Sequence, residues 1–225
     1  MRWQRNEMNP DQHQTLGSSC RQAIQRVFAP RSVQLKPVLA WLALYSAITA
    51  GWYMLWQGNP QIAEENCAME SFEALCLLVG ILLLGGAIHS AAGAPQRILL
   101  FGLTLFYLTV LVLEVDTRNM SVPVWVVRIS NGTIRNLWLG GLWVIAAALF
   151  LRQPRPVLSC FFSWLPSAAG RIMLCSGLFW GAALIAEKQF HVSFFVEELL
   201  ECNAALLTVQ SAWLTFRQVR HDSCQ

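Results

Sequence analysis

Charged side chains are scarce in this sequence of 225 residues, of which only 13% are Asp, Glu, Lys or Arg. Hydrophobic residues make up 55% of the chain, which also holds ten tryptophans. An ordinary soluble domain is about one quarter charged and about half apolar. The composition therefore excludes such a domain and predicts an integral membrane protein.

Motifs of the common soluble enzymes are also missing. The seven cysteines are dispersed without a Cys-x-x-Cys pair, and the glycines of GILLLGG and LGGLW are not followed by the Lys and Ser or Thr of a phosphate-binding loop. No nucleophile elbow and no nucleic-acid-binding module is present. We therefore expect no nucleic-acid partner, and we interpret the glycines as close contacts between membrane helices.

An apolar run is missing from residues 1–37, which are polar and carry six of the sixteen basic residues. A cleavable signal peptide needs an apolar core near its start, so none is expected here. We interpret residues 1–37 as a basic cytoplasmic tail, and the first membrane helix as a retained one.

Six long apolar segments follow this tail. A helix needs about 20 mostly apolar residues to cross the hydrocarbon core of a bilayer, and each segment meets or nearly meets that length. The segments are 38–56, 72–92, 98–115, 134–151, 172–186 and 199–216. We expect an all-α polytopic bundle of six transmembrane helices in residues 38–216, with a short cytoplasmic tail in residues 217–225.

Basic residues favour the cytoplasmic side of a membrane protein. With six spans, twelve of the sixteen Lys and Arg residues fall on the side of the two termini. The reverse orientation would place nearly all the positive charge outside. We therefore expect a protein of the inner (plasma) membrane, embedded in the lipid bilayer, with both termini in the cytoplasm.

Acidic residues gather on the opposite side, where ten of the thirteen lie. Glu114 follows Arg97 by 17 residues and Glu201 precedes Arg217 by 16, which is about 24–26 Å along a helix. The same reasoning applied to the second and fifth spans places their acids near this depth. Carboxylates from four helices are therefore expected just within the outer boundary of the membrane.

Spacing along the helices groups these acids further. Glu70 and Glu73 are three residues apart, as are Glu198 and Glu201, so each pair shares a helix face. Like charges this close repel unless a cation or a proton lies between them. We predict an outward-facing cation-binding pocket centred on Glu73, Glu114, Glu198 and Glu201. The full predicted set is Glu70, Glu73, Glu114, Asp116, Glu187, Glu198 and Glu201.

The sequence leaves open which kind of ligand this pocket binds. Carboxylates suit hard divalent metal ions, and His191 could add a nitrogen ligand for iron or zinc. A bound metal would support a second hypothesis, a hydrolase or transferase acting on lipid headgroups at the outer leaflet. The Glu-x-x-His spacing of a di-iron bundle is missing, and the few polar residues along the spans disfavour transport.

A structural role is the third hypothesis. Arg118, Arg128 and Arg135 lie on the acidic side, and Arg is well suited to compensating carboxylates in partly dry surroundings. The chain would then be a structural or assembly subunit with a membrane-protein partner.

Two local features complete the expectations. Cys67 and Cys202 both lie near outer helix ends, where they would form a disulfide if their helices adjoin or remain free thiols, the interpretation that we favour. Residues 152–171 combine Pro, Arg and aromatic side chains, which predicts an interfacial segment at the inner leaflet.

Overall fold

Helices make up almost the whole of the described chain. The computed structural model describes residues 35–63, 68–115, 122–186 and 194–223. Within these ranges there are eight α-helices, one short 3-10 helix and no strand. They are α2 (Leu35–Gly58), η1 (Pro60–Ala63), α3 (Ala68–Ser90), α4 (Ala94–Glu114), α5 (Val124–Ser130), α6 (Gly132–Arg152), α7 (Pro154–Trp164), α8 (Ala168–Ile185) and α9 (Phe194–Ser223). The all-α prediction is confirmed for this part of the chain.

Four of these helices, α3, α4, α6 and α8, are long and apolar enough to cross a membrane. They coincide with the second to fifth predicted spans. Helices α2 and α9 occupy the positions of the first and sixth predicted spans, with 24 and 30 residues, but neither meets the same criterion of length and hydropathy. The structure thus supports a multi-span membrane protein, while six spans and their orientation stay predictions.

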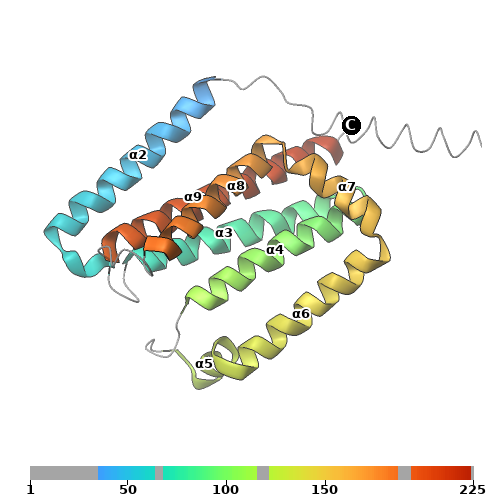
Figure 1. The fold of residues 1–225 in the computed structure, drawn as a ribbon, viewed down its shortest axis with the longest axis horizontal. Coiled ribbons are helices and arrows are strands. Elements are labelled where there is room, and N and C mark those ends of the chain that lie inside the picture. The colour runs from blue at the N-terminus through green and yellow to red at the C-terminus, as the bar shows by residue number, and fades with distance from the viewer. Residues whose placement is uncertain (1–34, 64–67, 116–121, 187–193, 224–225) are drawn as a thin grey trace, which may run out of the picture.

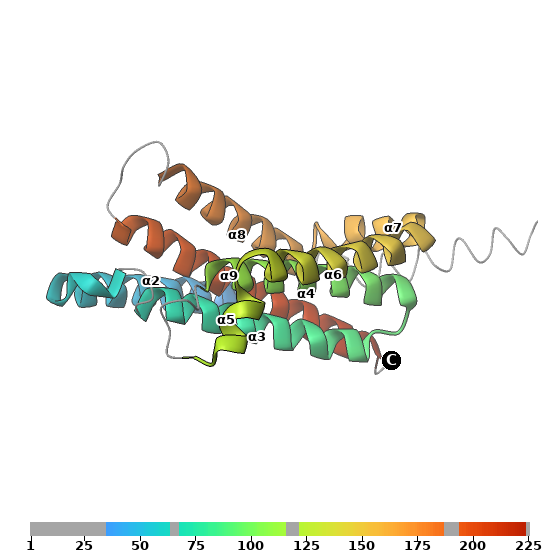
Figure 2. The same ribbon diagram turned by 90° about the horizontal axis from the view of Figure 1, so that it is seen from below.

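The helices lie side by side with α9 near the centre (Figure 1). Helix α9 packs along α3 and α8, and α3 packs along α4. Helix α2 flanks the bundle on one side through α9 and η1, and α6 flanks it on the other through α4. In the perpendicular view these helices still run along one long axis (Figure 2). This arrangement leaves α2 and α6 at the edges, where large apolar side chains such as Leu55 and Val144 are exposed.

Helix α9 is more polar than its neighbours, and many of its polar side chains face other helices. Thr208, Gln210, Ser211 and Thr215 are all buried. Several hydrogen bonds connect α9 to its neighbours. They are Tyr45 Oη to Gln210 Oε1 (3.0 Å), Thr49 Oγ1 to Asn203 Oδ1 (3.3 Å), Tyr107 Oη to the Thr208 carbonyl (3.2 Å), Trp164 Nε1 to Thr215 Oγ1 (3.1 Å), Ser176 Oγ to the Ala204 carbonyl (2.8 Å) and Ser211 Oγ to the Ala169 carbonyl (2.9 Å). Such bonds hold helices together where apolar burial gives little preference between helix and lipid.

The predicted interfacial segment contains a helix of its own. Helix α7 has 11 residues and begins at Pro154, a residue well suited to the first turn. Val157 and Trp164 are buried on one side of it, whereas Leu158 and Phe162 are exposed. The position of this segment at the inner leaflet stays a prediction.

The glycines of the two apolar runs behave differently. A Cβ atom on Gly80 would lie 2.9 Å from two ring carbons of Tyr107, and one on Gly86 would lie 3.1 Å from Phe216. Close helix contacts are therefore confirmed for these two residues. A Cβ on Gly85, Gly140 or Gly141 would have no neighbour within 4 Å in the described part of the chain, so the prediction was wrong for these three residues within this chain.

Candidate cation-binding site

Glu73 is a buried acidic residue of the bundle. It lies in the second turn of α3, and its exposed fraction is 0%. Neither carboxylate oxygen has a hydrogen-bond partner among the described residues. Buried polar atoms are nearly always paired, and an unpaired buried carboxylate is more costly than a neutral group. Such a residue requires an explanation beyond packing.

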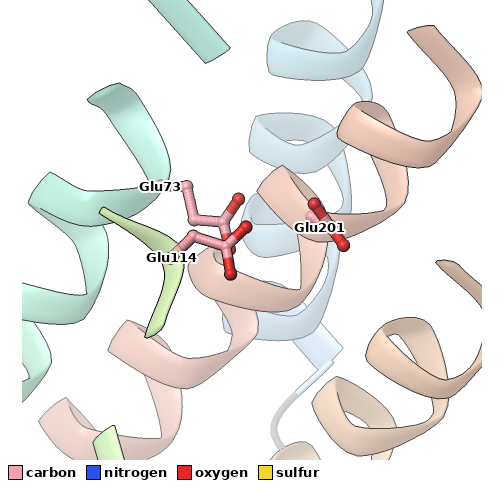
Figure 3. A group of neighbouring side chains, drawn as sticks. All are labelled: Glu73, Glu114 and Glu201. Atoms are coloured by element: carbon pink, nitrogen blue, oxygen red, sulfur yellow. The ribbon is translucent and has the colours of Figure 1, made fainter. Parts of the chain in front are cut away.

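Two further carboxylates meet Glu73. Glu114 is the last residue of α4, and Glu201 lies in the second turn of α9. Glu73, Glu114 and Glu201 each offer an oxygen, and the three atoms lie within 4.8 Å of one another. Their side chains come from three different helices and converge on one space (Figure 3). We call these three residues the glutamate trio.

Chain direction explains why the trio forms. Helices α3 and α9 begin at one end of the bundle, where α4 ends (Figure 1). Residues near the start of α3 and α9 therefore meet residues near the end of α4. Helix α4 stops directly after the site, since the Val115 backbone is extended (φ −76°, ψ 106°) and its N–H donates to the Leu111 carbonyl.

The helix dipoles do not favour every member of the trio. Acidic residues are stabilised in the first turn of a helix, where Glu70 of α3 and Glu197 of α9 lie. Glu114 stands at the negative C-terminal end of α4 instead, which opposes a negative charge. A carboxylate at this position, next to two others, is stable when a cation or protons neutralise it.

The distances suit a hard cation. Ca²⁺, Mg²⁺ and Mn²⁺ prefer oxygen ligands at roughly 2.0–2.6 Å, so two oxygens on one ion lie at most about 5 Å apart. The oxygens of the trio fall within this limit. No His or Cys atom belongs to the group among the described residues, and that donor set favours hard cations over zinc or copper.

Other predicted acids are placed nearby or outside the described residues. Glu70 precedes Glu73 by one turn of α3, and Glu198 precedes Glu201 by one turn of α9, but neither belongs to the group within 4.8 Å. The structure therefore brings together three of the four residues predicted at the centre. Asp116, Glu187 and His191 lie outside the described residues, so their predicted roles stay predictions.

The predicted arginine partners do not reach Glu73 in the described part of the chain. Arg128 is exposed on α5, and Arg135 of α6 donates from Nε to Asn136 Oδ1 at 3.3 Å. Glu73 accepts no hydrogen bond from either of them. Arg118 lies outside the described residues. A charge-compensating role of these arginines toward the other carboxylates stays a prediction.

An apolar cluster packs beside the trio. Met69, four residues before Glu73, and Cys202, directly after Glu201, are buried together with Phe195. Trp52 and Trp56 of α2 pack against this cluster, and the rings of Trp56 and Phe195 stack with centroids 4.6 Å apart. Cys202 is a free thiol, and its proposed partner Cys67 lies outside the described residues. The cluster thus includes Met69, one turn before Glu73 on α3, and Cys202, the neighbour of Glu201 on α9.

Sequence reasoning missed a layer of contacts below the trio. Tyr107 and Thr208 belong to the few polar residues along the spans, to which the sequence alone assigns no role. Both are buried, and the Tyr107 ring lies against Gly80 of α3. Their positions seven residues from Glu114 and Glu201 were a signal that could have found them, because residues seven apart share a helix face.

Comparisons with known proteins add no relative. A scan against models of protein families, a comparison with curated proteins and a comparison with solved structures each found no match. The function is therefore argued from the site alone.

Proposed function

We propose that this protein is a multi-pass membrane protein that binds a cation in the glutamate trio. The observation that carries the proposal is Glu73, fully buried and with neither oxygen hydrogen bonded among the described residues. Carboxylates that face the interior of a membrane bundle are costly and usually functional. A bound cation would offset negative charge on all three side chains at once.

Hard divalent ions are the class that the donor set supports best. The group contains carboxylate oxygens and no nitrogen or sulfur ligand among the described residues, and Ca²⁺, Mg²⁺ and Mn²⁺ are held by such ligands. Three carboxylates exceed the charge of one divalent ion by one unit. A shared proton or a nearby basic group would balance the remainder.

The proposal also includes an orientation. Arg97, Arg171 and Arg217 belong to the end of the bundle opposite the trio, at the start of α4 and α8 and toward the end of α9. Basic residues favour the cytoplasmic side. The trio would then face away from the cytoplasm across the inner membrane, with six spans and both termini inside.

The first experiment is purification in detergent without chelator, followed by elemental analysis and by thermal unfolding with and without Mn²⁺. We expect a stoichiometric metal ion or a rise in thermal stability with Mn²⁺. At a concentration 100 times the Kd, a specific ligand stabilises the folded state by about 2.7 kcal/mol. Glu114→Gln and Glu201→Gln should each abolish most of this stabilisation.

The matched control is Glu197→Gln, which removes a negative charge from the same end of α9 but outside the trio. We expect it to retain the response to Mn²⁺. An equal loss in all three variants would instead indicate a general effect of surface charge. Absence of any bound metal, together with no stabilisation by Mn²⁺, Mg²⁺ or Ca²⁺, would contradict metal binding and favour a protonated, structural trio.

A further inference from the structure

A layer of close contacts lies seven residues along each helix from the glutamate trio. Gly80 follows Glu73 by seven residues, Tyr107 precedes Glu114 by seven, and Thr208 follows Glu201 by seven. Because α4 runs opposite to α3 and α9, all three positions are displaced from the trio in the same direction. Seven residues of helix rise by about 10.5 Å. We call Gly80, Tyr107 and Thr208 the tyrosine layer.

Contacts in the tyrosine layer join the same three helices that carry the trio. A Cβ on Gly80 would lie 2.9 Å from Cδ2 and Cε2 of Tyr107 and 3.9 Å from Cγ2 of Thr208. The Tyr107 hydroxyl donates to the Thr208 carbonyl oxygen at 3.2 Å and lies 3.4 Å from Met173 Sδ. The aromatic ring thus fills the space between α3, α4 and α9, and only a residue without a side chain fits opposite it.

Hydroxyl bonds fix the α9 side of this layer. Thr208 Oγ1 lies 2.9 Å from Ser176 Oγ of α8 and donates to the Ala204 carbonyl at 2.9 Å. Ser176 also bonds to that carbonyl at 2.8 Å. Every hydroxyl of the layer has a partner, so the layer holds helices in place and offers no ligand site of its own.

We propose that Tyr107 is a positioning residue for the cation site, a proposal that rests on the proposed function. Its ring lies against Gly80 and its hydroxyl donates to the Thr208 carbonyl, so Tyr107 sets the spacing of α3, α4 and α9 seven residues along each helix from the trio. Metal coordination tolerates misplacement of only about 0.5 Å. A change in helix spacing at the tyrosine layer therefore separates the carboxylates without altering any of them.

Gly80→Ala is the main test, because it inserts one carbon atom where carbon contacts would be 2.9 Å. Carbon atoms pack at about 3.5–4.0 Å, so the Tyr107 ring or the helices that carry it and Gly80 must shift by about 0.6 Å or more, and we expect α3 and α4 to separate. We expect the affinity for Mn²⁺ to fall by about tenfold or more, the range seen for residues that orient metal ligands. The matched control is Gly85→Ala on the same helix, where the added atom meets nothing within 4 Å; it should change the affinity less than twofold.

Mn²⁺ is the probe, and its electron paramagnetic resonance spectrum is recorded together with the affinity. A changed spectrum in Gly80→Ala reports altered coordination, which a mere loss of stability would not produce. If Gly80→Ala fails to fold, Tyr107→Leu carries the test, since it removes the ring without inserting an atom. Tyr107→Phe keeps the ring against Gly80 and should retain Mn²⁺ binding within a few-fold.

The outcomes separate this proposal from the proposed function. Wild-type binding with an unchanged affinity and spectrum in Gly80→Ala and Tyr107→Leu would overturn the positioning role alone. An equal loss in Gly80→Ala and Gly85→Ala would overturn it as well, because the effect would not depend on the Tyr107 contact. A wild-type protein that binds no Mn²⁺ would overturn the cation site first, and the positioning role with it.

Discussion

At the scale of single residues, the proposed binding role of the trio comes with a cost in folding stability. Glu73 is fully buried with no hydrogen-bond partner among the described residues, whereas an apolar side chain of similar size would fill the same space without a desolvation penalty. Replacement of buried charged groups by apolar ones is often neutral or stabilising. Residues retained for binding commonly lower the stability of the folded protein.

Glu73→Leu tests this cost. In the presence of a chelator, we expect the variant to be more stable than the wild type by about 1–4 kcal/mol, because an unpaired buried carboxylate has been removed. With Mn²⁺ the order should reverse, since the variant lacks a ligand. Thermal unfolding in detergent under both conditions measures the difference. Lower stability of Glu73→Leu in the chelator would show that Glu73 has a stabilising partner in the ion-free protein.

At the scale of elements, α9 acts as the common partner of five other helices. It accepts hydrogen bonds from residues of α2, α4, α7 and α8, and its Cys202 Sγ donates to the Met69 carbonyl of α3. Its polar residues lower its hydropathy, which is why length and hydropathy alone do not identify it as a membrane span. Polar residues buried between helices are compatible with a membrane position because they are not exposed to lipid.

A double-mutant cycle on Ser176 and Thr208 measures one of these links. Their hydroxyl oxygens lie 2.9 Å apart, and interhelical hydrogen bonds in membrane proteins contribute about 0.6 kcal/mol on average, with a maximum near 1.7. We expect Ser176→Ala and Thr208→Val to be coupled by about 0.5–1.5 kcal/mol in unfolding free energy. The control is Ser163→Ala, because the Ser163 hydroxyl donates to the Ser159 carbonyl of its own helix. Strict additivity of the two changes would argue against a specific link.

At the scale of the whole molecule, charge is divided between the two ends of the bundle. The trio lies where α3 and α9 begin, and Arg97, Arg171 and Arg217 lie toward the other end. This division is what the distribution of basic and acidic residues along the sequence predicts for one fixed orientation.

Cysteine labelling tests the orientation. In a chain whose seven cysteines have been replaced, Asn59→Cys places an exposed thiol in the turn at the trio end, and Ala92→Cys places one in the turn at the arginine end. We expect a membrane-impermeant maleimide added to intact cells to label Asn59→Cys only. Labelling of Ala92→Cys instead would reverse the orientation and place the trio on the cytoplasmic side.

The sequence predicts the helices well because apolar runs of membrane length are a strong local signal. It also predicts that Glu73, Glu114 and Glu201 reach a common depth, since depth depends only on helix rise. It does not separate Glu201 from Glu198, because rotation about the helix axis is decided by packing against α3 and α8. The contact of Gly80 with Tyr107 cannot be predicted from single helices either, because it depends on which helices are neighbours.

The central position of α9 also has a consequence for biosynthesis. Membrane helices insert as the chain emerges, and they associate afterwards. Helix α9 emerges after α2, α4, α7 and α8, yet it supplies the partners of Tyr45, Tyr107, Trp164 and Ser176. Until α9 has been synthesised, these side chains lack their native partners, and two carboxylates of the trio stand without the third. The bundle therefore completes its assembly only after α9 has been translated, and ribosomes stalled before this helix would present an open, polar interior to the quality-control machinery of the membrane.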